Sequence, residues 1–200
     1  MMDIIRQKKV LAVEGKDEIN FFNALLEDVG ILDFEIHEVG GKDQFKSKLP
    51  ALVKMSGFSD VEVLVVIRDA DEDANAAFKS INDILRKVGF EPPEEINQFS
   101  YGRPKIGVFI MPGNSDTGTL EDLCLKTVKD HPAMDCVNAF IDCVSQLESP
   151  PNNFAKAKAQ TFLAAMPNIA CSVGVAAQKQ YWDFDSEVLT AIKVFLEKMK

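Results

Sequence analysis

Two groups of carboxylates each follow an apolar run that has the composition of a buried β-strand. Residues 10–13 lead into Glu14, and residues 63–67 lead into Asp69 and Asp71. Runs of β-branched residues are typical of parallel strands that are covered on both faces. Because functional groups collect at the carboxyl ends of such strands, we expect these three side chains to meet at one edge of one sheet. Crowded carboxylates repel each other unless a cation neutralises them, and oxygen ligands favour Mg²⁺ or Mn²⁺. The sequence therefore predicts a divalent metal site.

A third acidic position follows another apolar strand. Residues 105–111 are expected to form a strand that ends before Pro112, and Thr119 is placed to cap the next helix. Asp122 is placed to complete that cap, which gives it a structural role. Glu121 follows a strand end at the same edge of the sheet as Glu14 and Asp69, so it could add a metal ligand.

An alternating order of strands and helices must position these residues. Apolar residues recur at helical spacing from Ile19 to Val29, and residues 34–39 alternate as in a strand. Further helices are expected over 42–55, where Pro50 would kink or divide the helix, and over 74–88. A loop over 92–103 has room for a short strand. This βαβαβαβ order predicts an α/β fold with a central, mostly parallel sheet of about four strands flanked by helices.

The rest of the chain reads as helical, with a break over residues 149–153. We expect an α/β core over 1–130 and a helical C-terminal extension over 131–200, packed together as a single compact unit. Cys136 and Cys143 lie seven residues apart beside Phe140, which suggests core packing. Trp182 and Phe184 could stack on a base or pack a terminal helix against the sheet.

Composition restricts the class of function. The net charge of −9 argues against a protein that grips long duplex nucleic acid with a basic surface. A small flexible substrate fits this charge, as does a homodimer or a partner protein that supplies the binding surface. We expect no membrane span and no secretion signal, because the apolar stretches are too short. The four cysteines show no metal-ligand spacing, and reduced, mostly buried thiols indicate a cytoplasmic protein.

The motifs as a set resemble the TOPRIM domain of topoisomerases, bacterial primases and the overcoming-lysogenization-defect (OLD) nucleases. The resemblance rests on Glu14 after the first strand and on Asp69-Ala70-Asp71 after the third. It is strongest to small stand-alone TOPRIM-like proteins of unassigned function, which share three further stretches. Here these are Gly15-Lys16-Asp17, Gly118-Thr119-Leu120-Glu121-Asp122-Leu123 and Trp182-Asp183-Phe184. The resemblance covers nearly the whole chain and implies a Rossmann-like TOPRIM fold.

The resemblance also implies roles for single residues. Glu14 matches a glutamate that acts as general acid/base or metal ligand in phosphodiester chemistry, and Asp69 and Asp71 match metal ligands. Relative to the OLD nucleases, Glu18 matches a second acidic position and Glu121 resembles a ligand for a second metal. A downstream lysine in those enzymes stabilises charge, a role open here to Lys156 or Lys158. Two metals bridged by a phosphate can activate the attacking oxygen and stabilise the leaving one.

Two classes of function remain open. The first is Mg²⁺-dependent phosphodiester cleavage of nucleic acid by a nuclease-like protein, with Glu14, Glu121 and Lys158 in catalytic roles. The second is a non-catalytic metal-binding regulatory or interaction module with the same fold. We recognise no topoisomerase tyrosine domain, primase zinc ribbon or ATPase module in the sequence, and we therefore expect neither topoisomerase nor primase activity. Neutralisation of the acids by Arg68 or Lys16 in place of metal would favour the second class.

Overall fold

A mainly parallel five-stranded sheet forms the centre of the structure, a computed structural model that describes residues 4–113 and 117–200. The strands are β1 (Lys9–Val13), β2 (Phe34–Glu38), β3 (Val63–Asp69), β4 (Gln98–Phe99) and β5 (Lys105–Met111), in the order β2-β1-β3-β5-β4. Only β4 pairs in the antiparallel direction, at one edge of the sheet. The predicted α/β class with a mostly parallel sheet is confirmed, and β4 adds a fifth strand within the loop predicted over 92–103.

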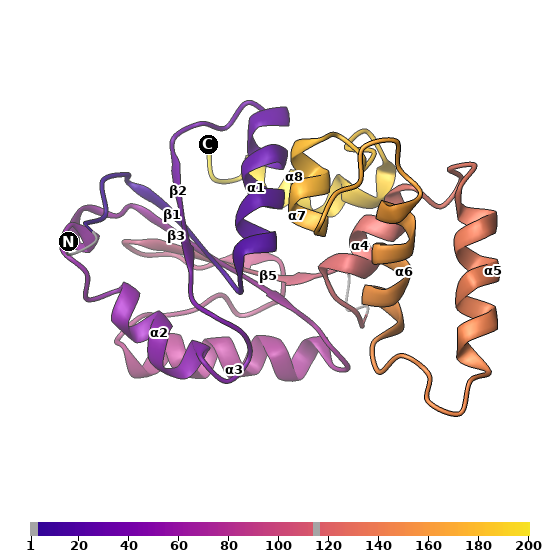
Figure 1. Ribbon diagram of the computed structural model, residues 1–200. Coiled ribbons are helices and arrows are strands. Elements are labelled where there is room, and N and C mark those ends of the chain that lie inside the picture. The colour runs from indigo at the N-terminus through magenta and orange to yellow at the C-terminus, as the bar shows by residue number, and fades with distance from the viewer. Residues whose placement is uncertain (1–3, 114–116) are drawn as a thin grey trace.

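Helices cover both faces of this sheet (Figure 1). They are α1 (Lys16–Asp28), α2 (Phe45–Leu52), α3 (Ala74–Lys87), α4 (Leu120–Thr127), α5 (Met134–Ser145), α6 (Phe154–Ala164), α7 (Val173–Gln178) and α8 (Thr190–Glu197). Figure 1 shows α2 and α3 on one face, α1 and α7 on the other, and α4, α5 and α6 beyond the carboxyl end of β5. The carboxyl edge of the sheet therefore lies close to α4, which continues the chain after β5.

Alternation along β3 determines which layer of helices each side chain meets. Val65 and Ile67 belong to the core on the α1 side, whereas Leu64 and Val66 belong to the core on the α2 and α3 side. All four residues are fully buried because both faces of the strand are covered. If this alternation continues past Ile67, Arg68 points to the α2 and α3 side of the sheet and Asp69 points to the α1 side.

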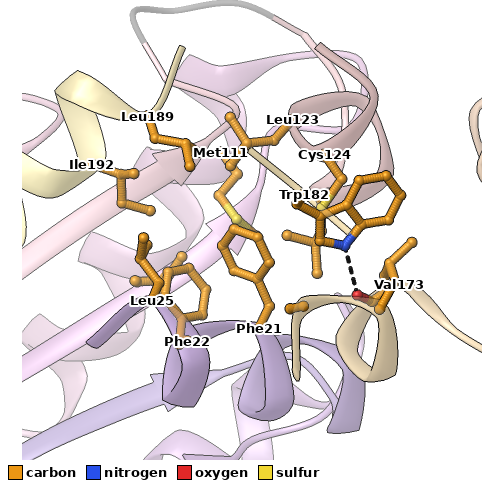
Figure 2. Packing of buried hydrophobic residues seen from close by; sticks show 14 of the residues in the cluster. Phe21, Phe22, Leu25, Met111, Leu123, Cys124, Val173, Trp182, Leu189 and Ile192 are labelled. Atoms are coloured by element: carbon orange, nitrogen blue, oxygen red, sulfur yellow. Dashed lines mark hydrogen bonds between the residues drawn. The ribbon is translucent and has the colours of Figure 1, made fainter. Parts of the chain in front are cut away.

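The core on the α1 side joins the first helix to the end of the chain. Figure 2 shows Phe21, Phe22 and Leu25 of α1 facing Met111 of β5, with Leu189 and Ile192 close by. On the same side Gly174 of α7 lies so near α1 that an added Cβ would come within 2.5 Å of the Asp17 carbonyl oxygen. The residues after 130 thus share a core with the sheet.

One predicted feature of the fold is corrected. The helix expected over 42–55 is shorter, Phe45–Leu52, and it contains Pro50 near its end, where only one turn is left to disturb. Residues 114–116, between the predicted strand over 105–111 and the predicted cap at Thr119, lie outside the described residues. No helix in the described part of the chain is both long and apolar enough to cross a membrane.

The prediction that most thiols are buried is wrong. Cys124 is buried, but Cys136, Cys143 and Cys171 are exposed. The reason lies in α5, which packs only one face, through Met134 and Val137, against the rest of the protein. Positions on its opposite face, which include Cys136 and Cys143, are left in solvent.

Candidate metal and phosphodiester site

The predicted acidic residues all lie at the carboxyl edge of the sheet. Glu14 follows β1 directly, Asp69 is the last residue of β3, and Asp71 follows two residues later. Glu18 stands in the first turn of α1 and Glu121 in the first turn of α4. We call this group of five carboxylates the acidic rim.

Glu14 reaches from β1 to the neighbouring strand β3. The backbone N–H of Asp69 donates a hydrogen bond of 3.2 Å to Glu14 Oε1, and Arg68 Nε lies 3.7 Å from the same oxygen. Burial raises the pKa of Glu14 to about 7, and repulsion from Glu18 and Asp71 adds to this, against the opposing effects of the Asp69 N–H and Arg68. The Glu14 carboxyl is therefore only partly ionised at neutral pH.

Asp69 lies at the centre of the acidic rim. Burial is the largest cause that raises the pKa of Asp69 well above its usual value. Repulsion raises it further, with effects that decrease in the order Glu14, Glu18, Glu121 and Asp71. Its Oδ1 atom is buried and has no hydrogen-bond partner. A buried carboxylate oxygen without a donor is costly for the fold, which makes a bound cation its natural partner.

Glu18 and Glu121 belong to two different helices, and their charges repel each other. Burial raises the pKa of Glu18, and the charges of Asp17 and Glu121 raise it further, against the backbone N–H groups of Glu18 and Gly15. The neighbouring Asp17 has a structural contact, since its Oδ1 accepts a hydrogen bond of 3.2 Å from Gly174 N–H. Glu18 is thus the α1 carboxylate that belongs to the rim.

The first turn of α4 separates a capping carboxylate from a free one. Asp122 Oδ2 accepts a hydrogen bond of 2.9 Å from Thr119 N–H, so the predicted capping role of Asp122 is confirmed. Within the described part of the chain the Glu121 side chain makes no hydrogen bond or ion pair. Glu121 is therefore not used to cap its own helix.

A backbone bridge holds the two acidic loops together. Asp71 N–H donates to the Gly118 carbonyl at 3.0 Å, and Gly118 N–H donates to the Asp71 carbonyl at 2.8 Å. Asp71 adopts the left-handed conformation with φ of 53°, which aspartate tolerates better than most residues. The bridge fixes the segment after β3 against the segment that leads into Glu121.

The predicted lysines belong to a later helix. Lys156 and Lys158 lie on α6, the first exposed and the second half-buried. Neither side chain forms a hydrogen bond or ion pair with any residue that the structure describes. A role for Lys158 at the rim stays a prediction.

The donor set suits a hard divalent cation. Every candidate ligand is a carboxylate oxygen, the chemistry that Mg²⁺ and Mn²⁺ prefer, and Asp69 Oδ1 lacks a partner. The carboxylates do not converge on a single point: over residues 4–113 and 117–200, no three His, Cys, Asp or Glu side chains could hold a metal ion as they stand. Binding would require rotation of the carboxylates toward Asp69.

Sequence reasoning did not anticipate the environment of Arg68. This side chain is 2% exposed, its guanidinium carbon lies 5.6 Å from the Phe45 ring centre, and its Nε and Nη1 atoms make no hydrogen bond. Alternation along β3 turns Arg68 toward α2 and α3, whereas Asp69 is turned toward α1. The sequence did contain one signal for this burial: Arg68 is a charged residue at a strand position that alternation assigns to the core.

The aromatic residues near the C-terminus have a packing role. Trp182 is 2% exposed, stacks on Phe162 with ring centres 5.3 Å apart, and donates a hydrogen bond of 2.8 Å from Nε1 to the Val173 carbonyl (Figure 2). Phe184 meets the Phe21 ring edge-on at 5.7 Å. Of the two alternatives for these rings, packing against the sheet layer is the one observed.

Comparison with known proteins places the fold. The structure is similar to the C-terminal region of the Xanthomonas campestris pv. campestris OLD protein, with 15% sequence identity, a TM-score of 0.51, and coverage of 98% of this chain and 97% of that chain. The C-terminal region of the Burkholderia pseudomallei OLD protein gives 15% identity and a TM-score of 0.49, with coverage of 98% and 100%. No curated protein matches the sequence. The family described as "Protein of unknown function (DUF3226)" matches residues 8–200, and the chain belongs to that family.

Proposed function

We propose that the acidic rim binds Mg²⁺ or Mn²⁺ and that the protein cleaves phosphodiester bonds in nucleic acid as a TOPRIM-like, nuclease-like hydrolase. The observation that carries the proposal is Asp69, whose Oδ1 is buried without a hydrogen-bond partner and whose charge is opposed by four other carboxylates. Such repulsion is costly without a cation and becomes favourable with one. The fold shared with the C-terminal region of the Xanthomonas OLD protein supports the same proposal.

Each rim residue has a role in this proposal. Asp69, Asp71 and Glu14 hold one metal, and Glu18 and Glu121 help to hold a second. Divalent cations at these positions would supply Lewis acidity toward a phosphodiester.

The charge of the chain shapes the expected substrate. Because the net charge is −9, we propose single-stranded or structured nucleic acid, engaged locally, over a long duplex. A second copy of the chain or a partner protein would supply any more extended binding surface.

The test is a cleavage assay on purified full-length protein with Mn²⁺ and with Mg²⁺. Single-stranded DNA, duplex DNA, single-stranded RNA and hairpin substrates are compared with an EDTA control. We expect metal-dependent cleavage of at least one substrate, and Asp69→Asn should lower it at least a hundredfold. Asp60→Asn, an exposed acid outside the rim, serves as the matched control. Equal cleavage by the wild type and Asp69→Asn would identify a contaminating nuclease and contradict the proposal.

One observation favours a second candidate, a non-catalytic regulatory module. Arg68 lies 3.7 Å from Glu14 and supplies positive charge at the rim without any metal. If this pair replaces a metal, cleavage is absent on every substrate, and Arg68→Gln creates or strengthens metal binding instead of leaving it unchanged. That pair of results would select the regulatory module.

A further inference from the structure

A cavity of about 220 Å³ opens beside the acidic rim, on the side of the sheet that α2 and α3 cover. It lies where the segment after β2 and the segment after β3 come together. Its walls are formed by Lys42, Asp43 and Lys46 from the first segment, Arg68 and residues 70–73 from the second, and three residues of α3. The cavity is distinct from the α1 side of the rim, where Glu18 and Glu121 lie.

Arg68 is the residue that makes this cavity suitable for an anion. It is the most deeply buried charged side chain of the wall, and its Nε and Nη1 donors have no hydrogen-bond partner. A guanidinium keeps its charge and only donates hydrogen bonds, so a bound cation would leave both donors unsatisfied. The carboxylate of Glu14 lies 3.7 Å from Nε, beyond hydrogen-bonding distance. The unpartnered donors of Arg68 therefore favour an anion that accepts hydrogen bonds over a cation.

Two further features favour a phosphate. Lys42 and Lys46 stand exposed at the opening, and α3 starts at the cavity wall, so its positive end faces the same space. Of the acidic wall residues, Asp73 is engaged in the α3 cap through a hydrogen bond of 2.9 Å from Ala76 N–H. Asp43, Asp71 and Glu72 also belong to the wall but are exposed, so solvent screens their charge more than that of the buried Arg68.

The loop that carries Lys42 lies directly against the rim. Gly40 has a φ of +73°, a conformation that glycine adopts without strain. A Cβ added to Gly41 would lie 3.8 Å from Glu14 Oε2, so the backbone here passes beside the rim carboxylate. A phosphate held by Arg68 would consequently sit next to Glu14.

We infer that Arg68, Lys42 and Lys46 form a binding site for a phosphate group of a phosphodiester, next to the group that the rim would cleave. Assignment of this phosphate to the substrate rests on the proposed function, but the anion site itself does not. The site gives an acidic protein a local anchor for an anionic substrate, and it orients that substrate relative to Glu14 and Asp69.

The test uses full-length protein in EDTA at fixed ionic strength, with ³¹P NMR line broadening as the readout. Inorganic phosphate and a dinucleoside monophosphate are titrated separately, because one carries a free phosphate and the other a diester. We expect saturable binding of the diester at millimolar concentration or below. Lys42→Gln/Lys46→Gln, which changes only exposed side chains, should weaken it at least fivefold, and Arg68→Gln should weaken it at least tenfold.

The control is Lys48→Gln/Lys54→Gln, which removes the same charge from the same region at exposed positions outside the cavity wall. It should leave the dissociation constant within twofold of the wild-type value. No saturable binding, or an equal loss in both double variants, would overturn the inference. Binding of inorganic phosphate alone would overturn its assignment to a phosphodiester.

These outcomes are separable from the failure of the proposed function. Because metal is absent, phosphate binding that survives in Asp69→Asn supports the anion site even if the rim never binds Mn²⁺. Metal binding at the rim without phosphate binding would retain the proposed function and reject this inference.

Discussion

The backbone N–H of Asp69 donates a hydrogen bond to the Glu14 carboxylate across the carboxyl ends of β3 and β1. This contact joins the two acidic motifs, which lie 55 residues apart in the sequence. The strands β1 and β3 are neighbours in the sheet, which explains why the two motifs meet. Burial at this edge raises the pKa of Glu14 to about 7, although the hydrogen bond from Asp69 N–H acts in the opposite direction.

The first prediction concerns the stability of the metal-free protein as a function of pH. Burial raises the pKa of Glu14 from 4.5 to about 7, so the native state binds this proton more tightly than the unfolded chain. Stability from this group is present below about pH 4.5 and is lost as the pH rises through about 7. The loss is on the order of 3 kcal/mol.

Urea unfolding of the wild type and Glu14→Gln at several pH values between 4 and 8 measures this effect. The variant should gain stability relative to the wild type as the pH rises, because it cannot ionise. Glu94→Gln, at an exposed position, should show no such trend. A constant difference between Glu14→Gln and the wild type over this range would contradict the assignment.

The second prediction separates two adjacent carboxylates of α4. Asp122→Ala removes the acceptor for Thr119 N–H and should cost about 1 kcal/mol, or about 2–4 °C in the melting temperature. Glu121→Gln removes a carboxylate without hydrogen bonds and should leave the melting temperature unchanged or raise it.

In the cleavage assay we expect the larger effect from Glu121. Glu121→Gln should lower turnover at least tenfold, whereas folded Asp122→Ala should stay within threefold of the wild type. Loss of stability in Glu121→Gln equal to that in Asp122→Ala would show that Glu121 is structural.

The third prediction concerns the aromatic packing in Figure 2. Trp182→Phe removes the hydrogen bond from Nε1 and leaves the Val173 carbonyl without that donor, at a cost of about 1–3 kcal/mol. Tyr181→Phe removes a hydrogen bond of 2.7 Å to the Asn168 carbonyl at an exposed site and should cost less, since water can replace the donor. Thermal unfolding by circular dichroism measures both. Unchanged stability in Trp182→Phe combined with weaker nucleic-acid binding would restore the base-stacking alternative for this ring.

The strands and the helix caps could be predicted because their signals are local. The strand β5 matches the predicted range, α3 starts and ends close to its predicted limits, and Asp122 caps α4 as expected. Apolar period, β-branched composition and capping residues determine these features within a few residues of sequence.

Features that depend on which face is covered could not be predicted in the same way. Cys136 and Cys143 have apolar neighbours on a helix, yet they are exposed because nothing packs on that side of α5. Alternation along β3 assigns Arg68 to one face of the sheet, but its contact with Phe45 depends on the position of α2, which the strand sequence does not determine. The gathering of the carboxylates at one edge of the sheet could be predicted from the strand topology. The orientation of each carboxylate could not, because it depends on side-chain rotation and on any bound cation.

The most direct test of the central claim is the response of the melting temperature to Mn²⁺ in the wild type and Asp69→Asn. A cation that binds only the native state at a hundred times its dissociation constant adds about 2.7 kcal/mol of stability. We therefore predict a saturable rise in the melting temperature of the wild type and none in Asp69→Asn, which should itself be as stable as the metal-free wild type or more stable, because repulsion at the rim is relieved. No Mn²⁺-dependent rise in the wild type, or the same rise in Asp69→Asn, would contradict a metal site at the acidic rim.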